Sequence, residues 1–150
     1  MTSVSYDVFT DAFLQKIMEY DFINMEEDER TALIDSYMKR AIADFRKICK
    51  YDLSTTADDV LREFAVEVAD ADVDELAEII SEGMVAQWMK PFTYKQEGLE
   101  NVLNTKDFTS YSPAELLLRI SEAYKKSQRD FTNKMREYSY NHGDLTDLHL

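Results

Sequence analysis

Apolar residues recur at three- and four-residue steps in four stretches of the chain, which is the spacing of an amphipathic helix. These stretches cover residues 7–20, 24–48, 73–89 and 113–138. The spacing is clearest in the second stretch, where one face carries Leu33, Ile34, Tyr37, Met38, Ala41, Ile42, Phe45 and Ile48. A face of this width is typical of a helix that packs against a core. The pattern therefore predicts four main helices.

Capping residues support two of these helix starts. Asn24 is a suitable N-cap for the second helix, and Glu27 follows it three residues later, as in a capping box. The last helix has Ser112 as its cap, Pro113 at its first position and Glu115 at its third. The segment at 58–68, DDVLREFAVEV, fits either a helix or an extended strand.

The third predicted helix has signals at both ends and an unusual residue inside. Asp72 is its expected cap, and Pro91 ends it because proline cannot continue a helix. Gly83 lies in its interior, where glycine costs roughly 1 kcal/mol relative to alanine. A glycine at this point indicates a close crossing with another helix.

The fold class that follows is all-α, a small helical bundle of about four main helices with an extended C-terminal arm. The chain has 150 residues, enough for one domain with a core, and only three glycines and two prolines, which argues against a turn-rich β fold. We expect a bundle domain at 1–138 and an arm at 139–150. The residues expected in one core are Leu33, Tyr37, Ile42, Phe45, Ile80, Trp88, Leu117, Ile120 and Phe131.

Charge is distributed unevenly along the chain, whose formal net charge is −13. Residues 54–88 hold ten acids and one base, whereas residues 113–138 hold six bases and four acids. Because DNA-binding proteins neutralise phosphates with Lys and Arg, a chain this acidic is a poor DNA binder. Its acids form either a solvated face or a surface that stays near DNA without binding it. The candidate residues are Asp58, Asp59, Glu63, Glu67, Asp70 and Asp72.

No motif in the chain indicates catalysis, a cofactor or a metal site. Asp70, Asp72 and Asp74 resemble an EF-hand loop, but Glu75 stands where that loop needs glycine, so first-turn helix acids explain them better. The two histidines and the single cysteine, Cys49, do not make a zinc set. The sequence has no glycine-rich phosphate-binding loop, no GxSxG motif of hydrolases and no HExxH motif of zinc proteases. We therefore predict a protein that is not an enzyme.

Segments for export or membrane insertion are also lacking in the sequence. The N-terminus has no basic region followed by an apolar one, and no stretch approaches the roughly 18 apolar residues of a membrane span. A lone cysteine fits a reducing compartment. We expect the protein to be made in the cytoplasm and kept there, or in an assembly built there.

The chain ends in REYSYNHGDLTDLHL, which is unusually rich in aromatic residues and leucine for a terminal tail. Such a segment either docks on a partner and fills its pockets or folds back on its own bundle. The expected docking residues are Tyr138, Tyr140, His142, Leu145, Leu148 and His149.

The second half of the chain resembles the head–tail connector proteins, also called neck adaptors, of tailed bacteriophages that infect Gram-positive hosts. The resemblance is carried by NVLNTKDFTSYSPAELLLRI and MREYSYNHGDL, with support from GMVAQWMKP at 83–91. It implies a helical bundle, a dodecameric ring beneath the portal, and a C-terminal arm that docks on the portal. The implied partners are the portal protein, a tail-side neck or tail-terminator protein, and further copies of the chain, with genomic DNA passing through without specific binding.

Two functions follow from these expectations. The first is a structural connector in the neck of the virion, assembled in the host cytoplasm. The alternative is a cytoplasmic helical scaffold or regulator that binds one protein partner through its C-terminal tail.

Overall fold

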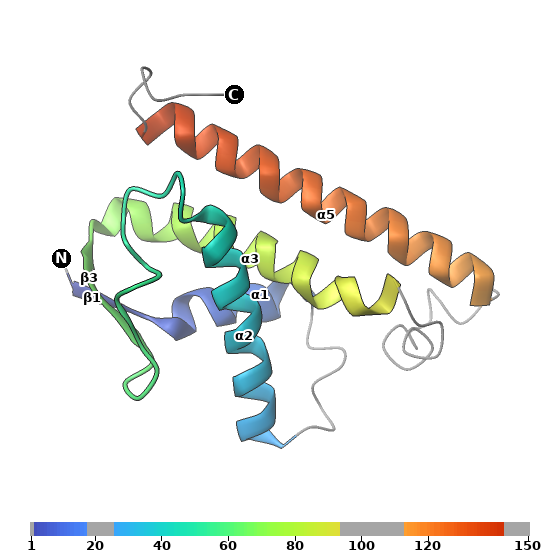
Figure 1. Ribbon diagram of the computed structural model, residues 1–150, viewed down its shortest axis with the longest axis horizontal. Helices are drawn as coiled ribbons and strands as arrows, with labels where there is room; N and C mark the ends of the chain where they lie inside the picture. The colour runs from blue at the N-terminus through green and yellow to red at the C-terminus, as the bar shows by residue number, and fades with distance from the viewer. Residues whose placement is uncertain (1, 18–25, 94–112, 143–150) are drawn as a thin grey trace.

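The computed structural model describes residues 2–17, 26–93 and 113–142, and within these ranges the chain is mostly helical with a small sheet (Figure 1). Its elements are β1 (Thr2–Ser5), α1 (Tyr6–Ile17), α2 (Glu27–Phe45), β2 (Ala57–Asp58), β3 (Glu63–Val68), α3 (Asp70–Met89), the 3-10 helix η1 (Lys90–Thr93) and α5 (Pro113–His142). None of the helices in the described ranges is long and apolar enough to cross a membrane.

Helix α3 is the centre of the fold. It packs against α1, α2 and α5, and the long helix α5 runs alongside it in the opposite direction (Figure 1). Its sequence explains this position, because apolar residues occur almost all round its second half and leave little surface for water. Its buried residues are Leu76, Ile79, Ile80, Ser81, Gly83, Met84, Val85, Ala86 and Trp88.

The core contains most of the residues expected from helical spacing. Leu33 is only partly buried against the core, and the side chain of Leu117 lies outside the described residues. The other expected members are buried, which confirms this part of the prediction: Tyr37, Ile42, Phe45, Ile80, Trp88, Ile120 and Phe131.

Gly83 lies at a three-helix crossing, as its position inside an apolar helix predicted. A Cβ atom at this position would come within 2.9 Å of Ala41 Cβ on α2 and 2.8 Å of Phe131 Cζ on α5. Real Cβ atoms essentially never show contacts that short. Only glycine therefore lets α2, α3 and α5 approach one another this closely.

The sheet corrects the expectation of an all-α fold. It has three antiparallel strands in the order β1-β3-β2, and its central strand β3 resolves the ambiguous segment 58–68 as extended. Phe64 and Val68 are buried on one face of β3 while Ala65 and Glu67 are exposed, which is the period-two pattern of a half-buried strand. Its partner β1 comes from the chain's start, with Val4 opposite Phe64.

Several predicted helix ends also need correction. Helix α3 begins at Asp70 after Ala69 rather than after Asp72, and no side chain caps it. Helix α5 continues to His142, so residues 139–142 belong to this helix and not to an arm that begins after residue 138. The predicted caps Asn24 and Ser112 lie outside the described residues.

Candidate functional site

The hairpin of β2 and β3 uses two of the predicted acidic residues for its own structure. The Asp58 carboxylate accepts hydrogen bonds from the backbone N–H groups of Val60 and Leu61, at 3.0 and 3.1 Å, which closes the turn. Asp59 accepts hydrogen bonds from Lys39 Nζ and from the hydroxyl of buried Tyr6. The bond from Lys39 lowers the pKa of the Asp59 carboxyl. These two acids therefore have partners within the chain.

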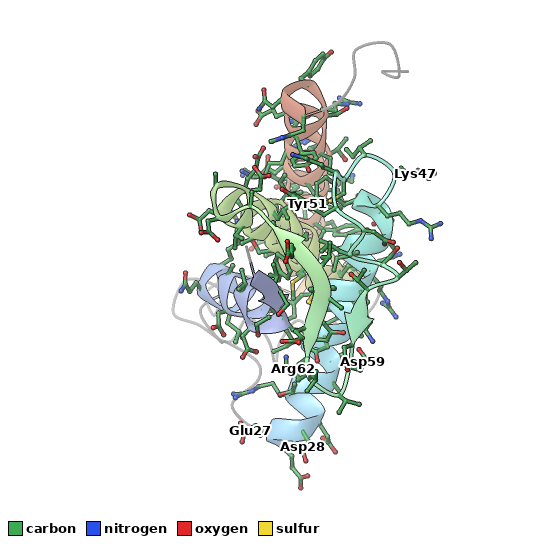
Figure 2. All side chains as sticks on the ribbon, turned by 90° about the vertical axis from the view of Figure 1, so that its left-hand side faces the viewer. Glu27, Asp28, Lys47, Tyr51, Asp59 and Arg62 are labelled. Carbon is green, nitrogen blue, oxygen red and sulfur yellow. The ribbon has the colours of Figure 1, made fainter. Side chains whose placement is uncertain are left out.

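Arg62, the only base among the acids of 54–88, holds the same hairpin against two helices (Figure 2). Its guanidinium donates two hydrogen bonds to Asp35 on α2, at 3.1 and 2.8 Å, and one to Asp7 on α1, at 2.8 Å. Its backbone has a φ of 52°, in the left-handed region that non-glycine residues rarely occupy. This fork of hydrogen bonds offsets the strain of that backbone conformation.

The remaining predicted acids extend along β3 to the start of α3. Glu67 and Asp70 are exposed, whereas Glu63 and Asp72 are half-buried. At about 3.3 Å per residue, Glu63 and Glu67 lie roughly 13 Å apart along the strand. The structure therefore divides the six acids into one group at the hairpin turn and another at the N-terminus of α3.

Tyr138 belongs to the fold's interior, which corrects its assignment to a docking surface. Its ring is fully buried and packs edge-on against Phe45, with ring centroids 4.9 Å apart. Its hydroxyl accepts a hydrogen bond from the Lys50 backbone N–H at 3.0 Å. Burial raises the pKa of this hydroxyl. Tyr138 thus fastens α5 to the segment that follows α2.

Of the other predicted docking residues, two lie on the last turn of α5 and three come after this helix in the sequence. Tyr140 is 58% exposed on the last turn of this helix, which leaves it accessible. His142 is half-buried and pairs with Glu75. Leu145, Leu148 and His149 lie outside the described residues.

A cluster of metal-ligating groups forms where α5 ends beside the start of α3. His142 Nε2 lies 2.8 Å from Glu75 Oε2, and one ligand atom from each of Asp72, Glu75 and His142 lies within 4.8 Å of the others. Asp72 and Glu75 share a helix face because they are three residues apart. The Tyr51 hydroxyl donates a hydrogen bond to Asp72 Oδ2, which raises the pKa of Tyr51. This arrangement can hold a cation.

Sequence reasoning missed this cluster because its parts are distant in the chain. The sequence predicts Asp72 as a helix cap, and the only partners that it suggests for His142 are His149 and Cys49, which do not make a zinc set. The spacing of Asp72 and Glu75 was visible in the sequence, but His142 lies 67 residues beyond Glu75. Only the packing of α5 on α3 brings these groups together.

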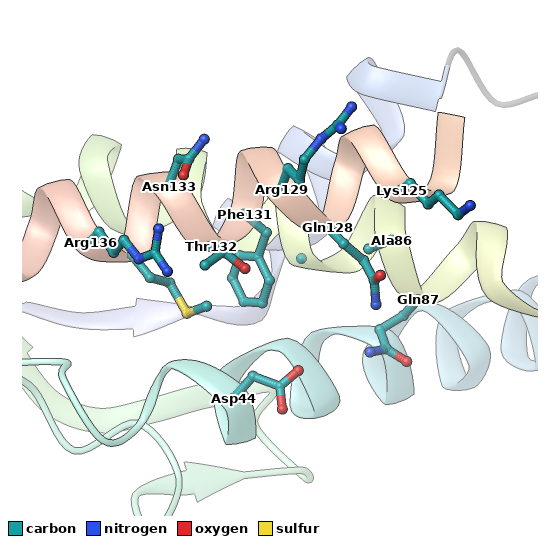
Figure 3. A pocket seen from close by; sticks show the side chains of 12 residues that line it. Asp44, Ala86, Gln87, Lys125, Gln128, Arg129, Phe131, Thr132, Asn133 and Arg136 are labelled. Atoms are coloured by element: carbon teal, nitrogen blue, oxygen red, sulfur yellow. The ribbon is translucent and has the colours of Figure 1, made fainter. Parts of the chain in front are cut away.

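A polar groove of about 760 Å³ runs between α2, α3 and α5 (Figure 3). Its wall on α5 carries Lys125, Arg129 and Arg136, which share a helix face because they are four and seven residues apart. Asp44 of α2 is the one acid among the lining residues. The groove therefore presents positive charge on a chain that is acidic as a whole.

A run of four acids lies at the end of α2 that points away from α5. Helix α2 begins on the side away from α5 (Figure 1). Its start carries the exposed acids Glu26, Glu27, Asp28 and Glu29, two of which are labelled in Figure 2. The fold thus separates a basic face on α5 from an acidic end of α2.

Comparison of the chain with protein-family models, with curated proteins and with solved structures found no match.

Proposed function

We propose that this chain is a structural head–tail connector of a tailed bacteriophage, a subunit of a ring that joins the portal to the tail and continues the DNA channel. The proposal rests on the resemblance of residues 83–91, 101–120 and 135–145 to that family and on the way charge is arranged in the fold. It assigns no reaction to the protein.

The separation of charge across the fold is the observation that carries the proposal. A ring forms when one face of each subunit binds a different face of the next, and the contact closes by rotation. The groove with Arg129 and Arg136 and the acidic start of α2 lie on different sides and carry opposite charges. Opposite charges on two faces favour head-to-tail contacts and oppose a contact of either face with itself.

The C-terminal segment provides the contact with the portal. Tyr138 and His142 fix the last turns of α5 to the body, through Phe45 and Glu75 respectively. Exposed Tyr140 and the residues after 142 then serve as the docking arm, with Leu145 and Leu148 as anchors. Aromatic and leucine anchors in partner pockets account for much of the binding energy in such interfaces.

The acidic surface suits a protein that lies beside a DNA channel without binding DNA. Glu67 and Asp70 are exposed, and few bases accompany them in residues 54–88. A duplex that must slide past a surface is repelled by such groups because they cannot neutralise its phosphates.

A co-purification experiment with the portal protein of the same phage tests the proposal. The full chain should co-purify with the portal, and a chain ending at His142 should not. The double variant Arg129→Glu/Arg136→Glu should still dock through its arm but should bind fewer copies per portal. Lys47→Glu provides the control, since Lys47 is exposed and lies outside the groove lining. Failure of the full chain to bind the portal would favour the cytoplasmic scaffold that binds a different partner.

A further inference from the structure

We propose that Asp72, Glu75 and His142 form a binding site for a divalent first-row transition-metal ion, with Zn²⁺ as the representative. The site joins the first turns of α3 to the last turn of α5. It is independent of the connector function, because it concerns the isolated chain.

The three ligand atoms lie close enough for side-chain rotations to bring them onto one metal ion. Zinc–oxygen and zinc–nitrogen bonds are about 2.0–2.2 Å long, so two ligand atoms of one tetrahedral ion lie roughly 3.3–3.6 Å apart. The atoms of Asp72, Glu75 and His142 lie within 4.8 Å of one another. Rotations of these half-buried side chains have to draw the atoms together by roughly 1 Å.

The hydrogen bond between His142 and Glu75 indicates where the ion would bind, namely between these two side chains. His142 Nε2 and Glu75 Oε2 are 2.8 Å apart and form a hydrogen bond. A metal ion would take the place of that hydrogen bond, since both the imidazole nitrogen and the carboxylate bind metals in their deprotonated forms. Binding therefore exchanges a hydrogen bond between two ligands for two metal–ligand bonds.

Neighbouring groups orient the ligands, as in established metal sites. The Tyr51 hydroxyl donates a hydrogen bond to Asp72 Oδ2 and so orients that carboxylate. The His142 ring stacks on the Tyr138 ring, with centroids 4.4 Å apart and planes at 29°. Because Tyr138 is fully buried, the imidazole rests on a fixed surface. Such outer partners typically raise metal affinity by about 10–100-fold.

The ligand set indicates which metals the site prefers. Imidazole nitrogen suits zinc, copper, iron and nickel, whereas calcium and magnesium prefer oxygen ligands alone and take six or more. Two carboxylates and one histidine leave a fourth position for water, as in the zinc sites of enzymes that have three protein ligands. The site therefore selects Zn²⁺ over Ca²⁺ and Mg²⁺.

The consequence of metal binding is a tighter connection between α3 and α5. Asp72 and Glu75 lie in the first two turns of α3, while His142 is the last residue of α5. An ion held by all three fixes the point at which residues 143–150 begin. Metal binding thus stabilises the last turn of α5.

The test uses the full chain, freed of metal with a chelator, and titrates it with ZnCl₂ in a calorimeter. One equivalent should bind, with a rise in melting temperature, and CaCl₂ or MgCl₂ should give neither. CoCl₂ should give the visible absorption of a low-coordinate Co²⁺ ion with a nitrogen ligand. Glu75→Gln and His142→Ala should each weaken Zn²⁺ binding at least tenfold, and Tyr51→Phe should weaken it by roughly tenfold.

Glu78→Gln is the matched control, because Glu78 lies one turn further along α3 and pairs with Lys16 and Lys134 outside the cluster. It removes the same charge and should leave Zn²⁺ affinity unchanged. Circular dichroism of each variant checks that the helices persist. The proposal is overturned if Zn²⁺ does not bind, or if it binds as several weak equivalents that Glu75→Gln and His142→Ala leave unaltered, since the cluster is then an ion pair alone.

Discussion

The Phe131 ring of α5 lies directly against the backbone of Gly83 in α3, so that a Cβ atom on residue 83 would come within 2.8 Å of Phe131 Cζ. Overpacking usually costs about 1–3 kcal/mol, whereas alanine gains roughly 1 kcal/mol over glycine from helix propensity. Gly83→Ala should therefore lower the free energy of unfolding by a net amount of up to about 2 kcal/mol. Urea unfolding followed by circular dichroism measures the difference.

A double-mutant cycle identifies the source of that loss. Phe131→Ala alone should cost about 3–5 kcal/mol, as removal of a buried aromatic ring usually does. In the Phe131→Ala background, Gly83→Ala should cost less than in the original chain, because the ring no longer obstructs the new methyl group and only the contact with Ala41 Cβ remains. An equal cost in both backgrounds would show that the contact with Phe131 is not responsible.

The fork of hydrogen bonds from Arg62 to Asp35 predicts that lysine cannot replace this arginine. Arg62→Lys keeps the charge but loses the two parallel hydrogen bonds, which should cost about 1–2 kcal/mol after allowance for the 32% exposure of the Arg62 side chain. Lys39→Gln, which removes an exposed ion pair with Asp59, should change stability by less than about 0.5 kcal/mol. Thermal unfolding of the two variants, Arg62→Lys and Lys39→Gln, measures both losses of stability. If Arg62→Lys costs as little as Lys39→Gln, the role given to Arg62 is contradicted.

Substitution of Tyr138 should affect stability, whereas substitution of Tyr140 should affect portal binding, although both tyrosines lie on the last turns of α5. Tyr138→Phe removes a buried hydroxyl and should cost about 1 kcal/mol, because the backbone N–H of Lys50 loses its acceptor. Tyr140→Ala should leave stability nearly unchanged, since this side chain is 58% exposed, and should weaken portal binding. Thermal unfolding and portal binding are measured for both variants. A large loss of stability from Tyr140→Ala would contradict this division.

Acid should weaken the contact between α1 and α3. The hydrogen bond from Lys16 lowers the pKa of Glu78 below its ordinary value of 4.5. A carboxyl whose pKa is lower in the folded state stabilises the fold above the unfolded pKa, and this contribution is lost as pH falls through the folded one. The stability that Lys16 confers should therefore be present at pH 6 and diminish below about pH 4.5.

The predicted loss of the Lys16 contribution in acid is tested by melting temperatures between pH 3 and pH 7, measured for the original chain and for Lys16→Gln. The difference between the two chains should shrink as the pH falls, while other carboxyls titrate in both. If the difference in melting temperature between the two chains stays constant over the whole pH range, the ion pair of Lys16 and Glu78 does not contribute through charge.

The helices could be predicted from the sequence because their signals are local. The apolar spacing of 24–48 and 73–89 identified α2 and α3, and proline at position 113 identified the start of α5. The close crossing at Gly83 could also be inferred, because an interior glycine needs a reason. Burial of the predicted core residues follows from the same spacing.

The sheet and the metal-ligating cluster could not be predicted because their partners are distant in the chain. Strand β3 is short, and it pairs with a strand from the start of the chain. Phe64 of β3 lies opposite Val4 of β1, which is 60 residues earlier in the sequence. Because this pairing is not local, the sequence of 58–68 alone fits a helix or a strand. The end of α5 could not be predicted for a related reason, since the contacts of Tyr138 with Phe45 and of His142 with Glu75 accompany a helix that continues to His142.

The number of copies bound per portal tests the connector function most directly. Native mass spectrometry of the portal mixed with excess chain should give a complex with one copy of the chain for each portal subunit, and the chain ending at His142 should give portal alone. A complex with a single copy of the chain, or no complex at all, would contradict the proposal that this protein forms a ring under the portal.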